Sequence, residues 1–362
     1  MLREFDRVMK KRMFSALAWA LVLTTIFAML FCIEIGLRTL GFEPWLPDRY
    51  RGKSECDYKE SNIDPAGKPA NYRPMLGLAN PPGIVKATMW DGYVWYATNL
   101  DNGLRITHPV ESYEHKQSKP KSEIWVLGCS VTYGFGLRDD QTYPWLLQSH
   151  LPQYEIRNWG ALGYGTLHSF IQLQEAFKSE KRPLVVVLAY ASFHDDRNTM
   201  FRPMRKIRSS WVGQNCFVVP YARIGPTGAL HVHAPEEVCY NELPLMRYSA
   251  FIHILERTYN AADRFFHTDH SVSVTREIFR QIIRLCQQNE VCPVVAGITQ
   301  DPSTGNVLAF CESLGAKVID ISVDVRLAEN RLLQDPHPSA KAHEHYASAL
   351  HSFLVRHALN CL

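Results

Sequence analysis

The stretch "IWVLGCSVTYGFGLRDD", residues 124–140, begins as an apolar strand and breaks at Gly128 into a turn that carries Ser130. A short run of apolar residues ended by glycine predicts a strand that is buried on both faces. Ser130 then has two interpretations: a nucleophile exposed on a strand-to-helix turn, or an inert turn residue that caps a helix. Which role applies depends on whether the rest of the sequence supplies a base and oxyanion donors for Ser130.

Further apolar runs follow this strand and alternate with helical patterns. The runs are "YEIRNWG" (154–160), "PLVVVLAY" (183–190), "CPVVAGI" (292–298) and "KVIDIS" (317–322), and the helical patterns cover 143–150, 167–178, 274–288, 306–314 and 340–357. This alternation predicts an α/β fold, a three-layer α/β/α sandwich around a parallel sheet. Residues 197–268 lack the alternation and are expected to form an insertion. Functional groups should gather at the carboxyl ends of the strands, near Ser130 and in the loops after Trp159 and Tyr190.

The segment from Met13 to Ile33 carries no charge over about 21 residues, close to the ~20 that a helix needs to cross a bilayer. We expect a transmembrane anchor over residues 13–36, because the run is longer than the apolar region of a cleaved signal peptide and no small-residue cleavage site follows it. Basic residues Lys10, Lys11 and Arg12 precede the span. The positive-inside rule therefore predicts a cytoplasmic terminus over residues 1–12 and an extracytoplasmic remainder.

Between this anchor and the first strand, residues 37–122 are rich in Pro, Gly, Asn and Tyr and predict a small irregular appendage with a few strands. Of the nine cysteines, Cys216 and Cys239 flank a loop-rich segment and are the candidate disulfide. No cysteine or histidine spacing typical of a metal site occurs, so we expect no metal.

Composition excludes some classes of protein. Hydrophobic residues make up 46% of the chain and the formal net charge is +3, which favours a globular protein and not a binder of nucleic acid. A short basic run beside Pro203, formed by Arg202, Arg205, Lys206 and Arg208, is predicted to be a solvated loop.

Three separated stretches together contain the groups that acyl transfer needs. "GCS" (128–130) offers a nucleophile, "NWGALGYGT" (158–166) a glycine-rich turn with an accessible backbone N–H at Gly163, and "DPHPSAKAHEHYASAL" (335–350) a carboxylate two residues from His337. A nucleophilic serine requires a base, a group that orients the base, and N–H donors for the oxyanion. All of these types of group are present in the sequence.

In type and in chain order, these stretches resemble the blocks of the SGNH/GDSL family of serine hydrolases, from Ile124 to the C-terminus. The resemblance implies a flavodoxin-like fold over residues 123–362, with Ser130 as nucleophile, His337 as base and Asp335 as its orienting acid. It also implies an oxyanion hole formed by the amides of Ser130 and Gly163 and a donor from a third block. The segment "EIGLR" (34–38) behind the span is similar to the membrane-anchored bacterial branch of the family.

The chain departs from the family pattern at three points. Cys129 stands where the first block usually has Asp, and the acid and base are separated by one residue instead of two. In the third block, "YASFHDDRN" (190–198), His194 takes the place of the usual Asn. A neutral imidazole can donate one hydrogen bond, so His194 is either the third oxyanion donor or a structural histidine. The histidines of the last helix, His343 and His345, are expected on the surface.

The resemblance and the anchor together imply a membrane-anchored serine esterase or O-acyltransferase. It would act on an acyl ester, in the first place an O-acetyl group of an envelope glycan or a small ester, through an acyl-Ser130 intermediate. No cofactor is expected, the lipid bilayer is a partner through the single span, and the location is the periplasmic side of the inner membrane. The alternative is a non-catalytic protein of the same fold that serves as a glycan-binding or assembly module.

Overall fold

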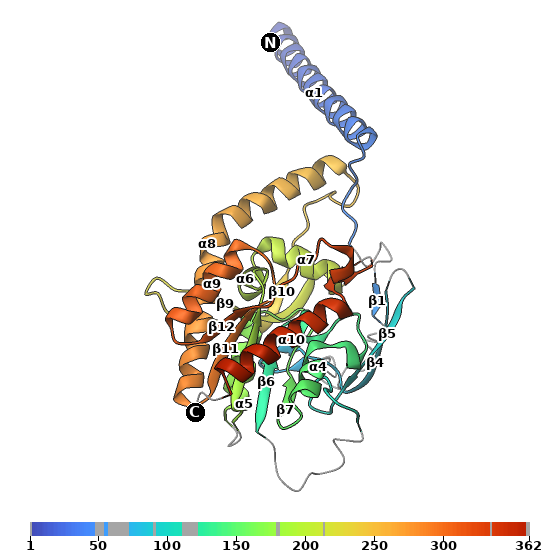
Figure 1. Ribbon diagram of the computed structural model, residues 1–362. Coiled ribbons are helices and arrows are strands. Elements are labelled where there is room, and N and C mark those ends of the chain that lie inside the picture. Colours follow the sequence, from blue (N-terminus) through green and yellow to red (C-terminus); the bar gives the residue numbers. More distant parts are fainter. Residues whose placement is uncertain are drawn as a thin grey trace. The chain divides into compact units, whose positions relative to one another are not determined.

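The computed structural model describes residues 2–47, 54–56, 72–89, 92–110, 122–178, 182–212, 214–333 and 335–359 (Figure 1). The chain divides into two compact units. One comprises Met1–Pro47 and Asn241–Asp263, and the other comprises Asp48–Tyr240 and Arg264–Leu362.

The second unit is built on a five-stranded sheet in the order β12-β11-β8-β6-β7. All neighbouring strands in it run parallel. The strands are β6 (Glu123–Leu127), β7 (Glu155–Asn158), β8 (Val185–Tyr190), β11 (Cys292–Gly297) and β12 (Lys317–Asp320). Taken in chain order, this is the flavodoxin-like arrangement, whose direction reverses between the first and third strands, here β6 and β8.

Helices cover both faces of this sheet (Figure 1). Side chains alternate along each strand, so Ile124 and Val126 face one side and Trp125 and Leu127 face the other. The first side packs against α4 (Tyr143–His150) and α10 (Ala340–His357); the second packs against α5 (Thr166–Ala176), the later part of α8 (Ala250–Gln288) and α9 (Pro302–Ser313). The three-layer α/β/α sandwich expected from the sequence is confirmed.

Shorter elements surround the carboxyl ends of the strands. They are α3 (Ser130–Tyr133), a 3-10 turn at Asp139–Gln141, α6 (His194–Thr199), another 3-10 turn at Ala328–Asn330, β13 (Arg331–Leu332) and β14 (Asp335–Pro338). β13 and β14 pair in antiparallel fashion. This short hairpin leads directly into α10.

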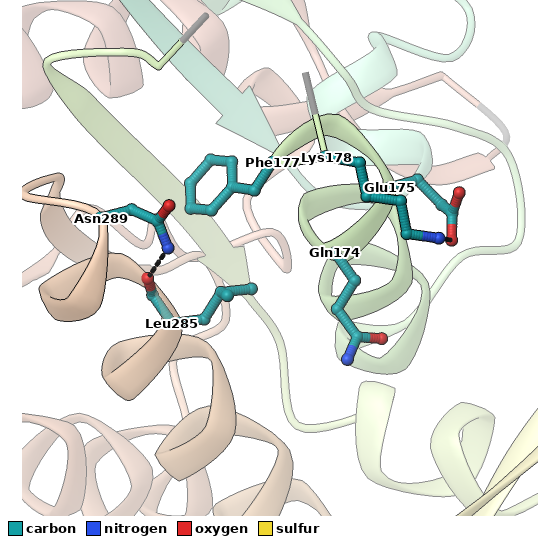
Figure 2. A pocket seen from close by; sticks show the side chains of 6 residues that line it. All are labelled: Gln174, Glu175, Phe177, Lys178, Leu285 and Asn289. Atoms are coloured by element: carbon teal, nitrogen blue, oxygen red, sulfur yellow. Dashed lines mark hydrogen bonds and ion pairs between the residues drawn. The ribbon is translucent and has the colours of Figure 1, made fainter. Parts of the chain in front are cut away.

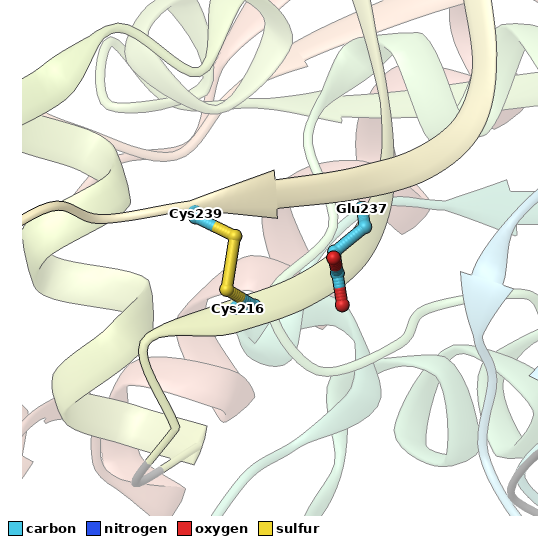
Figure 3. Close-up of side chains that lie close together, drawn as sticks. All are labelled: Cys216, Glu237 and Cys239. Atoms are coloured by element: carbon cyan, nitrogen blue, oxygen red, sulfur yellow. A yellow bond between two sulfur atoms is a disulfide. The ribbon is translucent and has the colours of Figure 1, made fainter.

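The region predicted as an insertion contains α7 (Arg202–Val212) and a long hairpin, β9 (Cys216–Ile224) and β10 (Leu230–Cys239). A disulfide joins Cys216 to Cys239 across the open end of this hairpin, with an S–S distance of 2.09 Å, which confirms the expected pairing (Figure 3). Glu237 lies beside it, but both thiols are consumed by the disulfide, so this cluster is not a metal site.

The basic run of α7 was wrongly expected to be a solvated loop. It is helical, and the side chain of Arg208 is buried at 5% exposure. Met204 lies one helical turn before Arg208 and is also buried, so the two residues share the inward face of α7. Tertiary contact, and not local charge density, decides where this arginine lies.

Part of the appendage, residues 37–122, belongs to the same compact unit as the parallel sheet. Its described elements are β1 (Ser54–Cys56), β4 (Gly83–Met89) and β5 (Val94–Asn99), which form an antiparallel sheet, and the small pair β2 (Tyr72–Arg73) and β3 (Gly77–Leu78). Residues 48–53, 57–71, 90–91 and 111–121 of the appendage lie outside the described residues.

The first unit contains α1 (Leu2–Thr39) and the start of α8. Within α1, Arg12–Thr39 is long and apolar enough to cross a membrane, by length and composition. At the end of this helix, the Glu34 carboxylate accepts hydrogen bonds from the Ser249 hydroxyl (2.8 Å) and from the backbone N–H groups of Ala250 (2.9 Å) and Phe251 (3.1 Å). Glu34 therefore caps the first turn of α8, where backbone N–H groups lack helical partners.

His343 was wrongly expected on the surface. It is 1% exposed, and its Nδ1 accepts a hydrogen bond of 2.9 Å from the backbone N–H of Tyr143, the first residue of α4. Burial, reinforced by the charges of Arg105 and His337, lowers the pKa of His343 to about 3. The imidazole is therefore neutral and satisfies an N–H that the helix itself leaves unpaired. His345 is exposed, as expected.

The buried His343 makes stability depend on pH. Its pKa is about 3 in the fold and ~6.5 in the unfolded chain, so the unfolded chain binds more protons between these values. Stability should be fully present above pH ~6.5 and should fall as the pH drops toward 3. We expect His343→Asn, which keeps an acceptor for the Tyr143 N–H, to reduce the stability lost between pH 7 and pH 5.

The measurement is urea unfolding at both pH values. The matched control is His345→Asn, an exposed residue on the same helix, which should leave the pH dependence unchanged. Equal pH dependence in wild type and His343→Asn would contradict the assignment of a neutral buried His343.

Candidate active site

Ser130 lies at the carboxyl end of β6, at the point where the strand order reverses. β6 ends at Leu127, Gly128 and Cys129 form the turn, and α3 begins at Ser130. A Cβ on Gly128 would collide with the Thr132 side chain, so the turn requires glycine there. Ser130 itself is 5% exposed. The tight turn thus fixes the serine at the edge of the sheet where ligands bind in this fold.

The structure brings Ser130, His337 and Asp335 together. The Ser130 Oγ lies 2.8 Å from His337 Nε2, and His337 Nδ1 lies 2.5 Å from Asp335 Oδ1. The backbone N–H of His337 also donates to Asp335 Oδ1, at 2.8 Å. One carboxylate oxygen therefore accepts from both the backbone and the ring of the same histidine. This local turn explains how an acid and base separated by one residue can still be paired.

The charge of Asp335 follows from its surroundings. Burial raises the pKa of Asp335, but the hydrogen bonds that its carboxylate accepts from the ring and the backbone of His337 outweigh burial and lower the pKa overall. The carboxylate is therefore ionised at neutral pH. The carboxylate accepts a hydrogen bond from a protonated Nδ1 of His337. Nε2 of the neutral ring then carries no proton, and its lone pair is directed at the Ser130 hydroxyl. In this tautomer His337 can accept the serine proton.

The glycine-rich turn after β7 packs against α3. A Cβ on Gly160 would collide with the backbone of Tyr133, and the Asn158 side chain joins the two turns by donating to the Thr132 carbonyl (3.1 Å) and accepting from the Gly160 N–H (3.0 Å). Gly163 has φ +72°, a left-handed conformation that favours glycine. The turn with the candidate donor is therefore held against the turn that carries Ser130.

The backbone N–H groups of Ser130 and Gly163 are available as donors. Within the described part of the chain, neither N–H donates a hydrogen bond. The carbonyl group of Gly163 accepts a hydrogen bond of 2.9 Å from Arg208 Nη1, and this bond orients the turn. Two unused N–H groups beside a nucleophile are the elements of an oxyanion hole.

His194 is fully buried at the start of α6. Its Nδ1 lies 3.4 Å from the Thr166 hydroxyl, and its Nε2 has no hydrogen-bond partner among the described residues. Burial, reinforced by the charge of Arg197, lowers the pKa of His194 well below its usual value, so the ring is neutral. With Thr166 donating to Nδ1, Nε2 would carry the proton and be a free donor. No hydrogen bond in the described residues joins His194 to Ser130.

Two buried arginines lie near the site: Arg197, to which the sequence assigned no role, and Arg208, which was expected in a solvated loop. Arg197 and Arg208 donate to the adjacent carbonyls of Tyr164 and Gly163, at 2.9 Å each. Neither guanidinium pairs with a carboxylate of the described residues. The side chain of Arg197 also contacts Cys129, the residue before Ser130. Both positive charges therefore lie next to the turn that carries the candidate oxyanion donor.

A cavity of about 360 Å³ lies elsewhere in the unit (Figure 2). It is lined by the end of α5 and the end of α8, through Gln174, Glu175, Phe177, Lys178, Leu285 and Asn289. The end of α5 leads into the amino end of β8, opposite the edge that carries Ser130. Its described ion pair, Lys178 with Glu175, is exposed. This cavity is therefore not the candidate active site.

Comparisons with known proteins give distant structural likenesses. No protein-family model and no curated protein matches the chain. The crystal structure of TesA is similar at 12% identity and a TM-score of 0.38, covering 64% of this chain and 98% of that chain. A G-D-S-L family lipolytic protein from Desulfitobacterium hafniense DCB-2 is similar at 10% identity and a TM-score of 0.37, covering 64% and 99%.

A mutant of the esterase AlinE4 is similar at 13% identity and a TM-score of 0.34, covering 67% of this chain and 98% of that chain. The solved structures that resemble this chain thus include proteins of the G-D-S-L group, which the sequence motifs also resemble. Identities and TM-scores are low, so the likeness bears on neither the residues of the site nor the substrate.

The free Nε2 of His194 can be tested by substitution. If it donates to the oxyanion, we expect His194→Ala to lower kcat by roughly 10²–10³, the typical cost of one lost donor, and His194→Asn to recover a substantial part. The measurement is kcat and melting temperature on both variants. A structural histidine predicts the opposite pattern: both variants melt at lower temperature, and activity per folded molecule stays near that of the wild type.

Proposed function

We propose that this chain is a serine esterase or O-acyltransferase that works through an acyl-Ser130 intermediate. The observation that carries the proposal is the continuous hydrogen-bonded series from Ser130 Oγ to His337 Nε2 and from His337 Nδ1 to Asp335. A nucleophile, a base in the correct tautomer and an orienting carboxylate define this type of catalysis on unrelated folds. Ser130 is the nucleophile, His337 the base and Asp335 the acid.

The reaction follows from these positions. Ser130 Oγ attacks the acyl carbonyl while His337 Nε2 takes the hydroxyl proton. The resulting oxyanion accepts hydrogen bonds from the amides of Ser130 and Gly163 and from His194 Nε2. When the intermediate collapses, the protonated His337 gives its proton to the leaving alcohol, and the acyl group stays on Ser130. Asp335 remains ionised and stabilises the imidazolium.

The second half-reaction decides between hydrolysis and transfer. Water that attacks acyl-Ser130 gives a free acid, whereas a sugar hydroxyl that attacks it gives a new ester; His337 serves as base in both cases. The substrate that we propose is an acyl ester, first of all an O-acetyl ester, on a glycan of the cell envelope. The support for an envelope substrate is the apolar helix α1, whose composition suits a membrane anchor.

The alternative, a non-catalytic glycan-binding or assembly module with the same fold, needs no contact between the serine and the histidine. A histidine turned away from Ser130, or blocked from it, would have favoured that alternative. The 2.8 Å distance between Ser130 Oγ and His337 Nε2 supports the enzyme instead.

The test of the proposal combines labelling with kinetics. A fluorophosphonate should label wild-type protein at Ser130, because only an activated serine reacts readily with such a reagent. Ser130→Ala, His337→Ala and the double variant should all hydrolyse p-nitrophenyl acetate at about the same residual rate, since residues of one mechanism are strongly non-additive. Ser149→Ala, an exposed serine on α4, is the matched control and should retain full labelling. Losses that multiply in the double variant, or an unlabelled Ser130, would overturn the proposal.

We further propose that the catalytic unit lies on the periplasmic side of an inner membrane, held by α1. The support is the basic cluster before the span together with the apolar length of α1. Alkaline phosphatase fused at the C-terminus should be active, because it requires an oxidising compartment, and green fluorescent protein at the same site should stay dark. A fusion directly after residue 12 is the control and should give the reverse. A fluorescent C-terminal fusion would place the catalytic unit in the cytoplasm.

A further inference from the structure

Arg105 belongs to the appendage but makes its contacts beside the nucleophile. Its side chain is completely buried. The guanidinium donates to the backbone carbonyls of Tyr133 (2.7 Å), Gly134 (2.7 Å) and Leu137 (2.6 Å), and Nε donates to Asp139 Oδ1 at 2.8 Å. These four acceptors lie in residues 133–139, which begin at the last residue of α3; a fifth, longer hydrogen bond of 3.4 Å goes from Nη2 to the Tyr96 carbonyl on β5. We call residues 133–139 the nucleophile loop.

The carbonyls that Arg105 binds include that of Tyr133, the last residue of α3, and that of Gly134, which also accepts from the Leu137 N–H at 3.2 Å. α3 ends at Tyr133, and Gly134 caps it in a left-handed conformation with φ +86°. A guanidinium provides five N–H donors in a fixed plane, so one Arg105 can hold several carbonyls of a tight loop at once. Lysine has a single ammonium group and cannot reproduce this geometry. The shape of the nucleophile loop therefore depends on the guanidinium.

The nucleophile loop carries Phe135, which touches the catalytic histidine. The Phe135 and His337 rings lie 4.5 Å apart between centroids at an angle of 37°. On β5 of the appendage, the buried Trp95 meets Phe135 edge to face at 5.2 Å. The Arg105 guanidinium lies 5.9 Å from the Trp95 ring. A series of contacts thus leads from the appendage, through Phe135, to the imidazole that must face Ser130.

We infer that Arg105 is a positioning residue: it fixes the nucleophile loop so that Phe135 holds the His337 ring in line with Ser130 Oγ. The inference rests on the proposed function and gives the appendage, residues 37–122, a part in the active site. His337 reaches Ser130 from the far end of the chain, on the short hairpin of β13 and β14. Its ring needs lateral support, and Phe135 supplies it. A displacement of about 1 Å can cost roughly 10²-fold in rate.

A merely structural role for Arg105 predicts a different result. In that case its loss would lower stability, and the molecules that still fold would react at the wild-type rate with the wild-type KM. A positioning role predicts a lower rate of the chemical step in folded molecules. The two roles are therefore separated by rates per folded molecule, and not by yield or melting temperature alone.

The experiment compares Arg105→Lys and Phe135→Leu with wild type in the full-length, detergent-solubilised chain. The probes are p-nitrophenyl acetate, for kcat and KM, and a fluorophosphonate, for the labelling rate of Ser130 in the folded fraction. We expect both variants to lower kcat and the labelling rate by roughly 10- to 100-fold, with little change in KM. Phe135→Tyr, which keeps the ring, should recover most of the rate.

Arg182→Lys is the matched control. Arg182 also donates to a backbone carbonyl and a side chain, those of Phe177 and Asn289, and its guanidinium also packs on an aromatic ring, but it precedes the amino end of β8. This variant should keep wild-type rates even if its melting temperature falls. If Arg105→Lys does not fold, Phe135→Leu carries the same test.

The outcomes distinguish this inference from the proposed function. Wild-type protein labelled at Ser130, with both variants labelled at the same rate, would overturn the positioning role and leave the esterase proposal standing. Wild-type protein that is not labelled at Ser130 would overturn both. Slow labelling in Arg105→Lys and Phe135→Leu, with normal labelling in Arg182→Lys, is the result that supports the inference.

Discussion

The close approach of two backbone turns is the constraint on which the site depends. The turn after β7 touches the turn after β6 because Gly160 has no Cβ; any side chain there would collide with the backbone of Tyr133. Asn158 fixes the approach with one hydrogen bond to each turn. The candidate nucleophile Ser130 and the candidate donor Gly163 follow separate strands, so the contact between their turns determines whether they can act on one carbonyl group. The parallel sheet brings the turns to one edge, and glycine allows them to meet.

Burial of positive charge is the second physical feature of this region. Placing a guanidinium in the interior costs free energy unless its donors are satisfied. Arg105 donates mainly to backbone carbonyls of the nucleophile loop, whereas Arg208 and Arg197 each donate to one described carbonyl, those of Gly163 and Tyr164, and the buried Arg208 Nε has no partner among the described residues. Only Arg105 of these three pairs with a described carboxylate, Asp139. Uncompensated positive charge therefore remains beside the candidate oxyanion hole, where a tetrahedral intermediate would carry its negative charge.

Local sequence pattern predicted a large part of this architecture. The strands and the bounds of α4 and α10 follow from apolar runs and helical periodicity. The pairing of Asp335 with His337 was instead implied by the family resemblance, and the backbone turn between the two residues makes it possible. His343 and Arg208 were placed wrongly because their burial depends on residues far away in the chain, the N–H of Tyr143 and the carbonyl of Gly163. Nothing in the local sequence around Arg105 indicates a contact with residues 133–139. Such long-range contacts arise from the topology, which local periodicity does not encode.

Two departures from the family pattern are connected through one side chain. Cys129 replaces the usual Asp of the first block, and His194 replaces the usual Asn of the third. Arg197 contacts the side chain of Cys129, and its charge adds to burial in lowering the pKa of His194. A carboxylate at position 129 would pair with this guanidinium and cancel much of its charge near His194. A thiol leaves more of this charge in place, but burial is the larger cause of the lowered pKa of His194 and by itself favours the neutral imidazole. Neutral imidazole is the form in which one ring nitrogen accepts from Thr166 while the other donates, as the donor role proposed for His194 requires.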